Sequence, residues 1–419
     1  MKTIGFILLC SLVISGCGTP WETTGNTITE KYNFVTESSL PYEEDTQLYS
    51  DVRGKDSKKE NQEVLKEENR EFTDEVKADM LRKQQELFYF SNLEITQQNL
   101  YVEILYALEN YIDEMEVSTT DTDEIDKVFQ CVMLDHPEIF YISGYSFVKY
   151  ALGDEVKKIV FKGTYEYNQE ERIHRELQID EAVNVFLANL KLESTDYEKV
   201  KYVYETVIYN TEYDMESADN QNICSVFLNH ASVCQGYAKA VQYLLNRLNI
   251  PTTLVLGTVE NGDGHAWNMV KIDNEYYFLD TTWGDASYRI QNNDEAEMIS
   301  DTPAISYDYL CVTTEELTRT HKLTEIVPIP ICDSLEANYY VREGAYFSEA
   351  DYEQLARLVE RYYDEDRETV TIRCGNDTVY QQMWKDLLEK QKIFNYIDGK
   401  NNSIIYTDLP KQRSITFWL

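Results

Sequence analysis

The stretch from Ser232 to Asp285 constrains the chain more than any other, because three residues with complementary chemistry occur in it in a fixed order. They are Cys234, His265 and Asp280. A thiol, an imidazole and a carboxylate can form a nucleophile, its general base and the group that orients the base. These three residues are therefore the candidate catalytic residues.

Cys234 stands at the predicted start of a helix. The residues after it repeat apolar side chains at helical spacing, and Pro251 disfavours continuation beyond Asn249. The partial positive charge of a helix N-terminus lowers the pKa of a thiol and favours the reactive thiolate. The apolar positions of this predicted helix are Ala240, Tyr243, Leu244 and Leu248.

Three strands are predicted after this helix. Each segment is rich in β-branched, aromatic or aliphatic side chains, and turn-forming residues separate the segments. The segments are TTLVLGTV (252–259), HAWNMVKI (265–272) and EYYFLDT (275–281).

The last two strands predict that His265 and Asp280 meet. If Asp273 and Asn274 form a two-residue hairpin turn, Trp267 lies opposite Asp280. Residues two apart on a strand point to the same face, so His265 becomes a diagonal neighbour of Asp280 within hydrogen-bonding reach. A three-residue turn would break this parity.

Other residues offer competing assignments. An isolated cysteine is most often a small buried hydrophobe, and the apolar flanks of Cys224 favour that interpretation over a nucleophile. His230 lies near Cys234 in sequence but lacks an evident orienting acid, so it is the weaker base. Asp135 and His136 precede a proline, which favours a capping or turn role, and His321 is expected to be structural.

Four motifs resemble those of a known family. They are VCQGYAKAVQYLLNRLNIP around Cys234, GHAWNMV around His265, YYFLDTTWGD around Asp280, and the upstream YEKVKYVYETVIYNTEYD (197–214). Over about residues 195–320, they resemble the transglutaminase-like superfamily, a branch of the papain-like cysteine enzymes. The resemblance implies that Cys234 is the nucleophile, that His265 is the general base and acid, and that Asp280 orients the histidine.

The fold expected from this resemblance is α+β with a papain-like, transglutaminase-like core. A helix bearing the cysteine packs on an antiparallel sheet bearing the histidine and the aspartate. A mixed N-terminal domain and a small C-terminal α/β domain are expected to flank this core. The C-terminal part shows the pattern β-α-β-α-β-β, whose first predicted strand is NYYVREGAYFS (338–348). This pattern predicts a compact α/β layer structure.

Further site residues are predicted around the three. The backbone N–H of Cys234 and the hydroxyl of Tyr213 are candidates for stabilising an oxyanion. Gln235, Trp267 and Trp283 are candidates for lining a substrate groove, and core packing is an equal alternative for the two tryptophans. No metal site and no cofactor are predicted, because the chain has no CxxC motif and its five histidines lie far apart in sequence.

The N-terminus, MKTIGFILLCSLVISGCGTP, predicts a lipoprotein signal. A short positive region and an apolar core precede small residues and Cys17. This pattern resembles a bacterial lipoprotein box, with cleavage before Cys17 and lipid on its thiol. The protein is then expected on the outer face of the bacterial cell membrane, anchored by lipid and not spanning the bilayer. A plain secretory signal is the alternative.

The predicted domains follow in order. They are a signal peptide (1–16), a lipidated cysteine with a flexible acidic tether (17–70), a helical and mixed N-terminal domain (71–192), the catalytic domain (193–325) and the C-terminal domain (335–419). The five cysteines other than Cys10, Cys17 and Cys234 show no paired spacing, so no disulfide framework is predicted.

Charge limits the possible partners. The chain holds 75 acidic against 38 basic residues, so its surface repels nucleic acid. We predict a cell-surface cysteine enzyme that cleaves or cross-links peptide or amide bonds, with hydrolysis favoured and cell-wall peptide among the candidate substrates. A non-catalytic surface binding or scaffold protein that keeps the fold, and a true protein-glutamine transglutaminase, are the alternatives.

Overall fold

The computed structural model describes residues 12–13, 71–152, 155–285, 305–397 and 404–419. The chain divides into two compact units, and nearly all described residues belong to the unit that contains residues 77–419. Among the described residues, no helix has the length and apolar character needed to cross a bilayer. Apart from residues 12–13, the predicted signal (1–16) lies outside the described residues, as do Cys17 and the whole of the predicted tether (17–70).

The N-terminal part combines four helices with a four-stranded antiparallel sheet of order β1-β3-β4-β2. Helix α4 is buried along most of its length, and α5 packs against it. The helices are α2 (Asp74–Lys83), α3 (Phe88–Ser91), α4 (Ile95–Glu109) and α5 (Thr122–Asp135). The strands are β1 (Leu12–Val13), β2 (Met115–Val117), β3 (Ile142–Leu152) and β4 (Glu155–Tyr165).

Asp135 and His136 have the structural role that the following proline indicated. Helix α5 ends at Asp135, and His136 is its C-cap. The buried carboxylate of Asp135 accepts hydrogen bonds from the backbone N–H groups of Tyr89 and Phe90, at 3.1 and 2.9 Å, and from the Tyr101 hydroxyl at 3.1 Å. It therefore fixes the start of α3.

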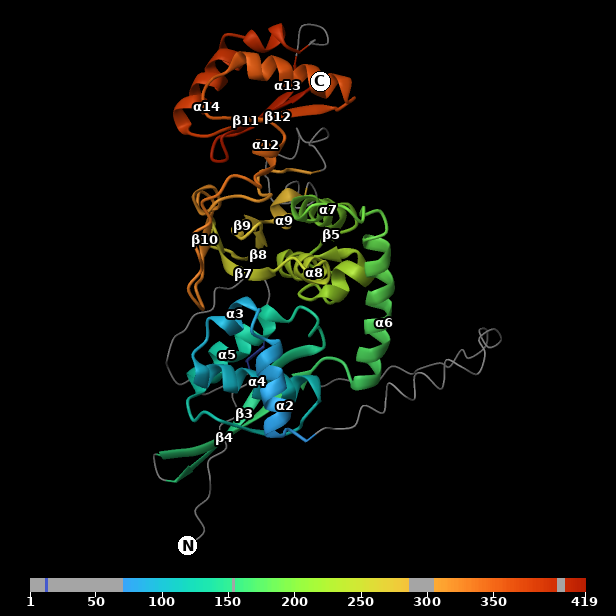
Figure 1. The fold of residues 1–419 in the computed structure, drawn as a ribbon, viewed down its shortest axis with the longest axis vertical. Helices are drawn as coiled ribbons and strands as arrows, with labels where there is room; N and C mark the ends of the chain where they lie inside the picture. Colours follow the sequence, from blue (N-terminus) through green and yellow to red (C-terminus); the bar gives the residue numbers. More distant parts are fainter. Residues whose placement is uncertain (1–11, 14–70, 153–154, 286–304, 398–403) are drawn as a thin grey trace, which may run out of the picture. The chain divides into compact units, whose positions relative to one another are not determined.

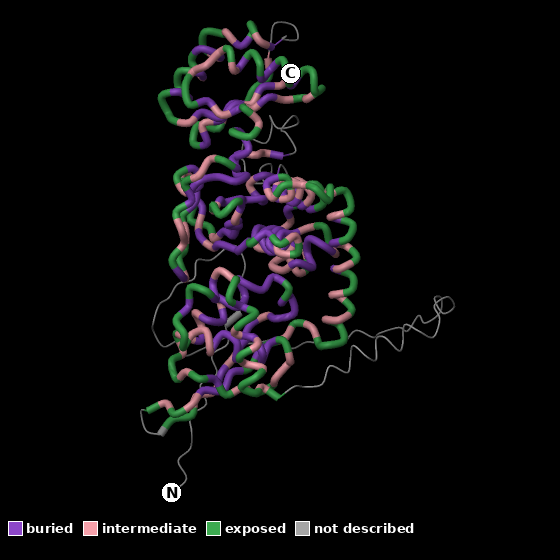
Figure 2. The backbone as a smooth tube through the Cα atoms, viewed as in Figure 1, coloured by how far each residue is buried: buried purple, intermediate pink, exposed green. Residues whose placement is uncertain are grey.

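Two helices precede the central part of the described chain, α6 (Gln169–Phe186) and α7 (Asp196–Tyr209). Thr195 caps α7 by accepting from the N–H of Glu198, whose side chain bonds back to Thr195. This reciprocal pair is a capping box, and it places the helix start where the sequence predicts it. Figure 2 shows α6 as a mixture of exposed and intermediate residues with few buried ones, in contrast to the central elements.

The central part of the described chain is built on one antiparallel sheet and one buried helix. The sheet has the order β10-β7-β8-β9. Figure 1 shows α8 beside α7 and next to this sheet. The elements are α8 (Cys234–Arg247), β7 (Thr252–Val259), β8 (Gly264–Ile272), β9 (Glu275–Leu279), α9 (Thr281–Gly284), α11 (Thr314–Leu317) and β10 (His321–Leu323).

The hairpin of β8 and β9 has the predicted parity. Asp273 and Asn274 form its turn, with φ angles of 52° and 70°, which suit a tight two-residue hairpin turn. Ile272 pairs with Glu275 and Asn268 pairs with Leu279, so the next register position sets Trp267 opposite Asp280. The predicted diagonal between His265 and Asp280 is therefore present.

Helix α8 is held against β8 by apolar packing and by a buried polar contact. The Asn268 amide, fully buried on β8, donates to the Ala238 carbonyl of α8 at 2.9 Å. Before α8, β5 (Glu212–Tyr213) and β6 (Ala231–Ser232) form a short parallel pair, and a π-helical turn covers Ser225–Asn229. These segments set the approach to Cys234.

The C-terminal part is a four-stranded sheet of order β11-β12-β14-β13 with helices between its strands. The predicted strand in NYYVREGAYFS is largely wrong. Asn338 accepts from the N–H of Tyr340 and so starts a short helix, and only the end of the segment is a strand. The elements are α12 (Tyr339–Arg342), β11 (Tyr346–Phe347), α13 (Tyr352–Asp364), β12 (Thr369–Cys374), α14 (Asp377–Trp384), β13 (Tyr406–Leu409) and β14 (Ser414–Trp418).

Cysteines contribute to these cores as buried hydrophobes. Among the described residues, five are buried and free. They are Cys131, Cys224, Cys311, Cys332 and Cys374.

Gly236, in the first turn of α8, leads to a testable prediction. A Cβ at this position would lie 2.0 Å from the Ser232 hydroxyl, 2.6 Å from the Ser225 hydroxyl and 2.8 Å from the Asn220 carbonyl. We expect Gly236→Ala to lower the free energy of unfolding by about 1–3 kcal/mol, because this turn has no room for a methyl group. Urea unfolding checks the value.

A double-mutant cycle with Ser232→Ala is the control for this prediction. Removal of the Ser232 hydroxyl relieves the closest clash, so the methyl group should cost less in the double variant than in the wild-type background. An equal cost in both backgrounds would contradict the steric explanation.

Candidate active site

His265 and Asp280 form a buried ion-pair contact. The Nε2 atom of His265 lies 2.7 Å from Oδ2 of Asp280. His265 is 6% exposed and Asp280 is fully buried. Because Nε2 contacts the carboxylate, Nδ1 is the ring nitrogen that would exchange a proton with a thiol.

Hydrogen bonds to both the side chain and the backbone of Asp280 hold it in place. It is the N-cap of α9, where its Oδ1 accepts from the N–H of Trp283 at 3.1 Å, and its own N–H donates to the Tyr309 carbonyl at 3.0 Å. Burial alone would raise the pKa of Asp280, but the charge of His265 and the hydrogen bonds from two histidines hold it well below its usual range. Asp280 is therefore an ionised, rigid acceptor.

His321 is the second histidine on this carboxylate. Its Nε2 lies 3.0 Å from Oδ2 of Asp280, the same oxygen that His265 contacts. The sequence predicted a structural role for His321 and gave no sign of this contact. The signal that could have found it is the pairing of β10 with β7, in which His321 opposes Val259 and so stands near the end of β8.

Cys234 occupies the first turn of α8, as predicted, and its side chain is fully buried. The N-cap residue, Val233, provides no side-chain acceptor for the first N–H groups of the helix. Asn168 and Thr195 provide one at the starts of α6 and α7. The N-terminus of α8 therefore directs its amides and its positive end toward the cysteine without a competing cap.

Tyr213 lies beside this helix start. It pairs with Ser232 in the short parallel ladder, two residues before Cys234. Burial raises the pKa of Tyr213 to about 12, and the negative charges of Asp280 and Asp263 act in the same direction. The hydroxyl keeps its proton at neutral pH and has the chemistry of an oxyanion donor.

The three predicted groove residues differ in their surroundings. Trp267 is 1% exposed and packs in the core with Met269 and Phe278, so it lines no open groove in this structure. Trp267 lies on the inward face of β8, and this explains its core position. Core packing was the alternative predicted for this residue. Trp283 and Gln235 are half-buried. The Trp283 ring lies 6.2 Å from the His265 ring and 4.7 Å from the His321 ring.

The rival catalytic residues are placed elsewhere. His230 is the C-cap of the π-helical turn, with φ of 55°, and its Nδ1 lies 3.1 Å from the Asn210 carbonyl. Cys224 is buried, and burial raises the pKa of its thiol to about 12. Neither residue has the geometry of the His265–Asp280 pair.

Residues 186–281 match the model of the Transglutaminase-like superfamily. The chain carries a transglutaminase-like domain. This finding and the mixed helix and strand content confirm the predicted α+β fold class.

Solved structures with low similarity were also found. A crystal structure of a TGase is 18% identical, with a TM-score of 0.25, over 39% of this chain and 48% of that chain. A protein provisionally named a cysteine protease, from Cytophaga hutchinsonii, is 15% identical, with a TM-score of 0.23, over 32% of this chain and 61% of that chain. The alignments thus span less than two thirds of either protein. A search of the curated proteins finds no match.

Among the described residues, one buried group could hold a metal ion. His265, Asp280 and His321 offer ligand atoms within 4.8 Å of one another. However, both histidines contact one carboxylate oxygen at hydrogen-bond distances, 2.7 and 3.0 Å. Each contact requires a proton on Nε2, so those nitrogen lone pairs are not directed at a shared cation.

One cavity of about 390 Å³ lies apart from the triad. Residues of α3, the loop around Pro251 and Met269 are among those that line it. Cys234, His265 and Asp280 are not among its lining residues. The assignment of the site therefore rests on its chemistry and geometry and not on cavity size.

The buried histidine predicts a pH dependence of stability. Burial lowers the pKa of His321 below its ordinary 6.5, although its hydrogen bond to Asp280 opposes that shift. The unfolded chain therefore binds a proton at His321 more readily than the folded protein, and the free energy of unfolding should fall as pH falls below 6.5. The slope from this group is at most about 1.4 kcal/mol per pH unit.

His321→Gln removes this titration, so the variant should lose less stability than the wild type between pH 7 and about pH 5, as measured by urea unfolding. Shifts in other groups, such as Asp135, whose pKa burial raises to about 6, are common to both proteins and cancel in the comparison. The exposed His174→Gln is the matched control. Parallel curves for wild type and His321→Gln would contradict the assignment.

Proposed function

We propose that this protein is a cysteine enzyme of acyl transfer that hydrolyses peptide or amide bonds. The observation that carries the proposal is the buried 2.7 Å contact between His265 and Asp280, on a sheet that packs against the helix beginning at Cys234. The match of residues 186–281 to the Transglutaminase-like superfamily supports the same chemistry.

The first half of the proposed reaction forms a thioester. The thiolate of Cys234 attacks the carbonyl carbon of the substrate, and the developing oxyanion accepts hydrogen bonds from the Cys234 N–H and the Tyr213 hydroxyl. When the tetrahedral species collapses, the carbon–nitrogen bond breaks, and His265 gives its Nδ1 proton to the leaving amine. Asp280 keeps the imidazole oriented throughout.

The second half resolves the thioester. Water attacks the carbonyl carbon, His265 takes a proton from it, and the carbon–sulfur bond breaks to release a carboxylic acid and the thiol. If an amine attacks in place of water, the product is a new amide and the reaction is a transamidation. We favour water, because it exceeds every amine in abundance outside a cell.

The substrate in this proposal is a peptide or protein, and no cofactor takes part.

We also propose that the protein acts at the outer face of the bacterial membrane, with Cys17 as the lipidated residue. Cys17→Ser should abolish incorporation of an alkyne-tagged fatty acid and release the protein from the membrane fraction. Unchanged labelling of the Cys17→Ser protein would contradict the anchor.

Cys234→Ala tests the enzymatic proposal. With a library of peptides and amides, we expect the wild type to release new amines, and the variant to lose at least about a thousandfold in rate, because no thioester can form. Mass spectrometry of a rapidly quenched reaction should show an acyl group on Cys234. Every assay contains a reducing agent, which keeps the Cys234 thiol reduced.

Cys224→Ala is the matched control, since it removes a neighbouring buried thiol that has no assigned role. Full activity of Cys234→Ala would contradict the mechanism. Addition of a primary amine distinguishes the two acceptors: incorporation of the amine into product, at the expense of the acid, would assign the enzyme as a transamidase.

A further inference from the structure

His321 makes two hydrogen bonds that fix its protons. Nε2 faces the ionised carboxylate of Asp280 at 3.0 Å, so Nε2 carries a hydrogen. In the neutral imidazole, Nδ1 is then an acceptor, and the Thr320 hydroxyl lies 2.8 Å from it. Thr320 therefore donates to His321, and His321 donates to Asp280.

The chain of hydrogen bonds continues beyond Thr320, and its members donate in the same direction. The Tyr309 hydroxyl lies 3.2 Å from the Thr320 hydroxyl, and the Gln412 amide nitrogen lies 2.5 Å from the Tyr309 hydroxyl. Gln412 can only donate through this nitrogen, so Tyr309 accepts from Gln412 and donates to Thr320. Every hydrogen bond from Gln412 to Asp280 thus points toward the carboxylate.

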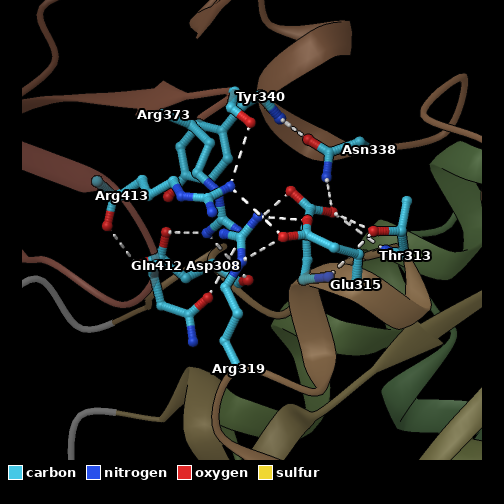
Figure 3. Close-up of polar contacts among 12 residues, drawn as sticks. Asp308, Thr313, Glu315, Arg319, Asn338, Tyr340, Arg373, Gln412 and Arg413 are labelled. Atoms are coloured by element: carbon cyan, nitrogen blue, oxygen red, sulfur yellow. Dashed lines mark hydrogen bonds and ion pairs between the residues drawn. The ribbon is translucent and has the colours of Figure 1, made fainter. Parts of the chain in front are cut away.

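Gln412 belongs to the C-terminal part, in the turn between β13 and β14. The opposite end of its amide accepts from Arg373 at 3.4 Å. Arg373, on β12, is fully buried and reaches Asp308 at 2.9 Å and Glu316 at 3.1 Å. Figure 3 shows Arg373, Gln412 and Asp308 directed toward one another. This buried cluster orients the Gln412 amide.

The whole connection is shielded from water. Gln412 is 3% exposed, Thr320 6%, Tyr309 4% and His321 4%. A directed chain of this kind, buried from end to end, loses little to competing water, and each member polarises the next.

We infer that His321 is a positioning residue for the proposed catalytic Asp280, and that the C-terminal part completes the active site through Gln412. His265 must gain and lose a proton during turnover, so its own contact with Asp280 changes in strength. His321 takes no part in that proton transfer and provides Asp280 with a donor that is present in every step. This inference rests on the proposed function, because it assigns a role within that triad.

The first test compares His321→Phe with His321→Gln in the full-length protein. Phenylalanine keeps the ring and the packing but cannot donate, whereas the glutamine amide nitrogen can approach the position of Nε2. We expect His321→Phe to lower kcat by about tenfold to a hundredfold with little change in KM, and His321→Gln to retain most of the activity. Equal losses in both variants would overturn the inference.

A substrate-independent readout accompanies the kinetics. The rate of alkylation of Cys234 by iodoacetamide is followed from pH 4 to pH 10 with peptide mapping. In His321→Phe, a less well held Asp280 supports the pairing of the Cys234 thiolate with His265 less, so the rise in alkylation rate should move to higher pH. A lower melting temperature without a change in the profile would mean a purely structural role and overturn the inference.

The second test concerns the C-terminal part. Gln412→Leu removes the first donor of the chain, and we expect the same change in kcat and in the alkylation profile, at about threefold or more. Lys411→Ala is the matched control, because it removes only the exposed ion pair of the same turn with Glu260. Wild-type behaviour of Gln412→Leu would overturn the role of the C-terminal part.

Two further outcomes separate this inference from its alternatives. If Cys234 of the wild type is unreactive across the whole pH range, the proposed function itself fails. If Cys234 is reactive but His321→Phe matches the wild type, only the positioning role fails. Loss of activity with a chelator, restored by zinc alone, would assign the two histidines and Asp280 to a metal and overturn the hydrogen-bond role.

Discussion

The candidate active site depends on one buried negative charge, the carboxylate of Asp280. A fully buried carboxylate is costly unless hydrogen-bond donors replace the water that it loses. Asp280 receives donors from three separate segments of chain, namely His265 on β8, His321 on β10 and the N–H of Trp283 in α9. The packing of β7, β8, β10 and α9 around Asp280 therefore depends on the ionised state of its carboxylate. The stability of the fold and the proposed catalysis both require this ionised carboxylate.

A second buried charge joins the C-terminal sheet to this arrangement. Arg373 is compensated by Asp308 and Glu316, both of which lie in the segment between α9 and β10. Removal of either acid would leave an uncompensated buried cation, which is far more costly than the loss of a surface ion pair. The cluster thus stabilises one orientation of β12. Because Arg373 on β12 contacts Gln412, this orientation also fixes the first donor of the hydrogen-bond chain that ends at Asp280. A separate domain with only surface contacts could not transmit position in this way.

Local patterns in the sequence predicted the contact between His265 and Asp280. They did not predict the position of His321, which depends on strand pairing between distant segments. The turn at Asp273 and Asn274 sets a two-residue parity, so the meeting of His265 and Asp280 could be derived without any tertiary information. The capping pair of Thr195 and Glu198 is equally local. His321 is different, because its place depends on the register of β10 on β7, more than 60 residues earlier in the chain. No short-range pattern encodes such a register.

One local error and one assignment that the sequence left open have a related physical cause. The apolar and aromatic residues from Tyr339 predicted a strand, but the Asn338 side chain accepts the N–H of Tyr340, and that bond begins a helical turn. Trp267 alternates correctly along β8, and its depth follows from side chains such as Phe278, Tyr309 and Val312 that pack on that face. Periodicity identifies the face of a strand on which a residue lies, whereas burial depends on what covers that face. For the proposed enzyme, the sequence therefore predicted the three reactive residues from one stretch. The residues that surround and orient them come from distant segments, whose contacts are defined only in the folded chain.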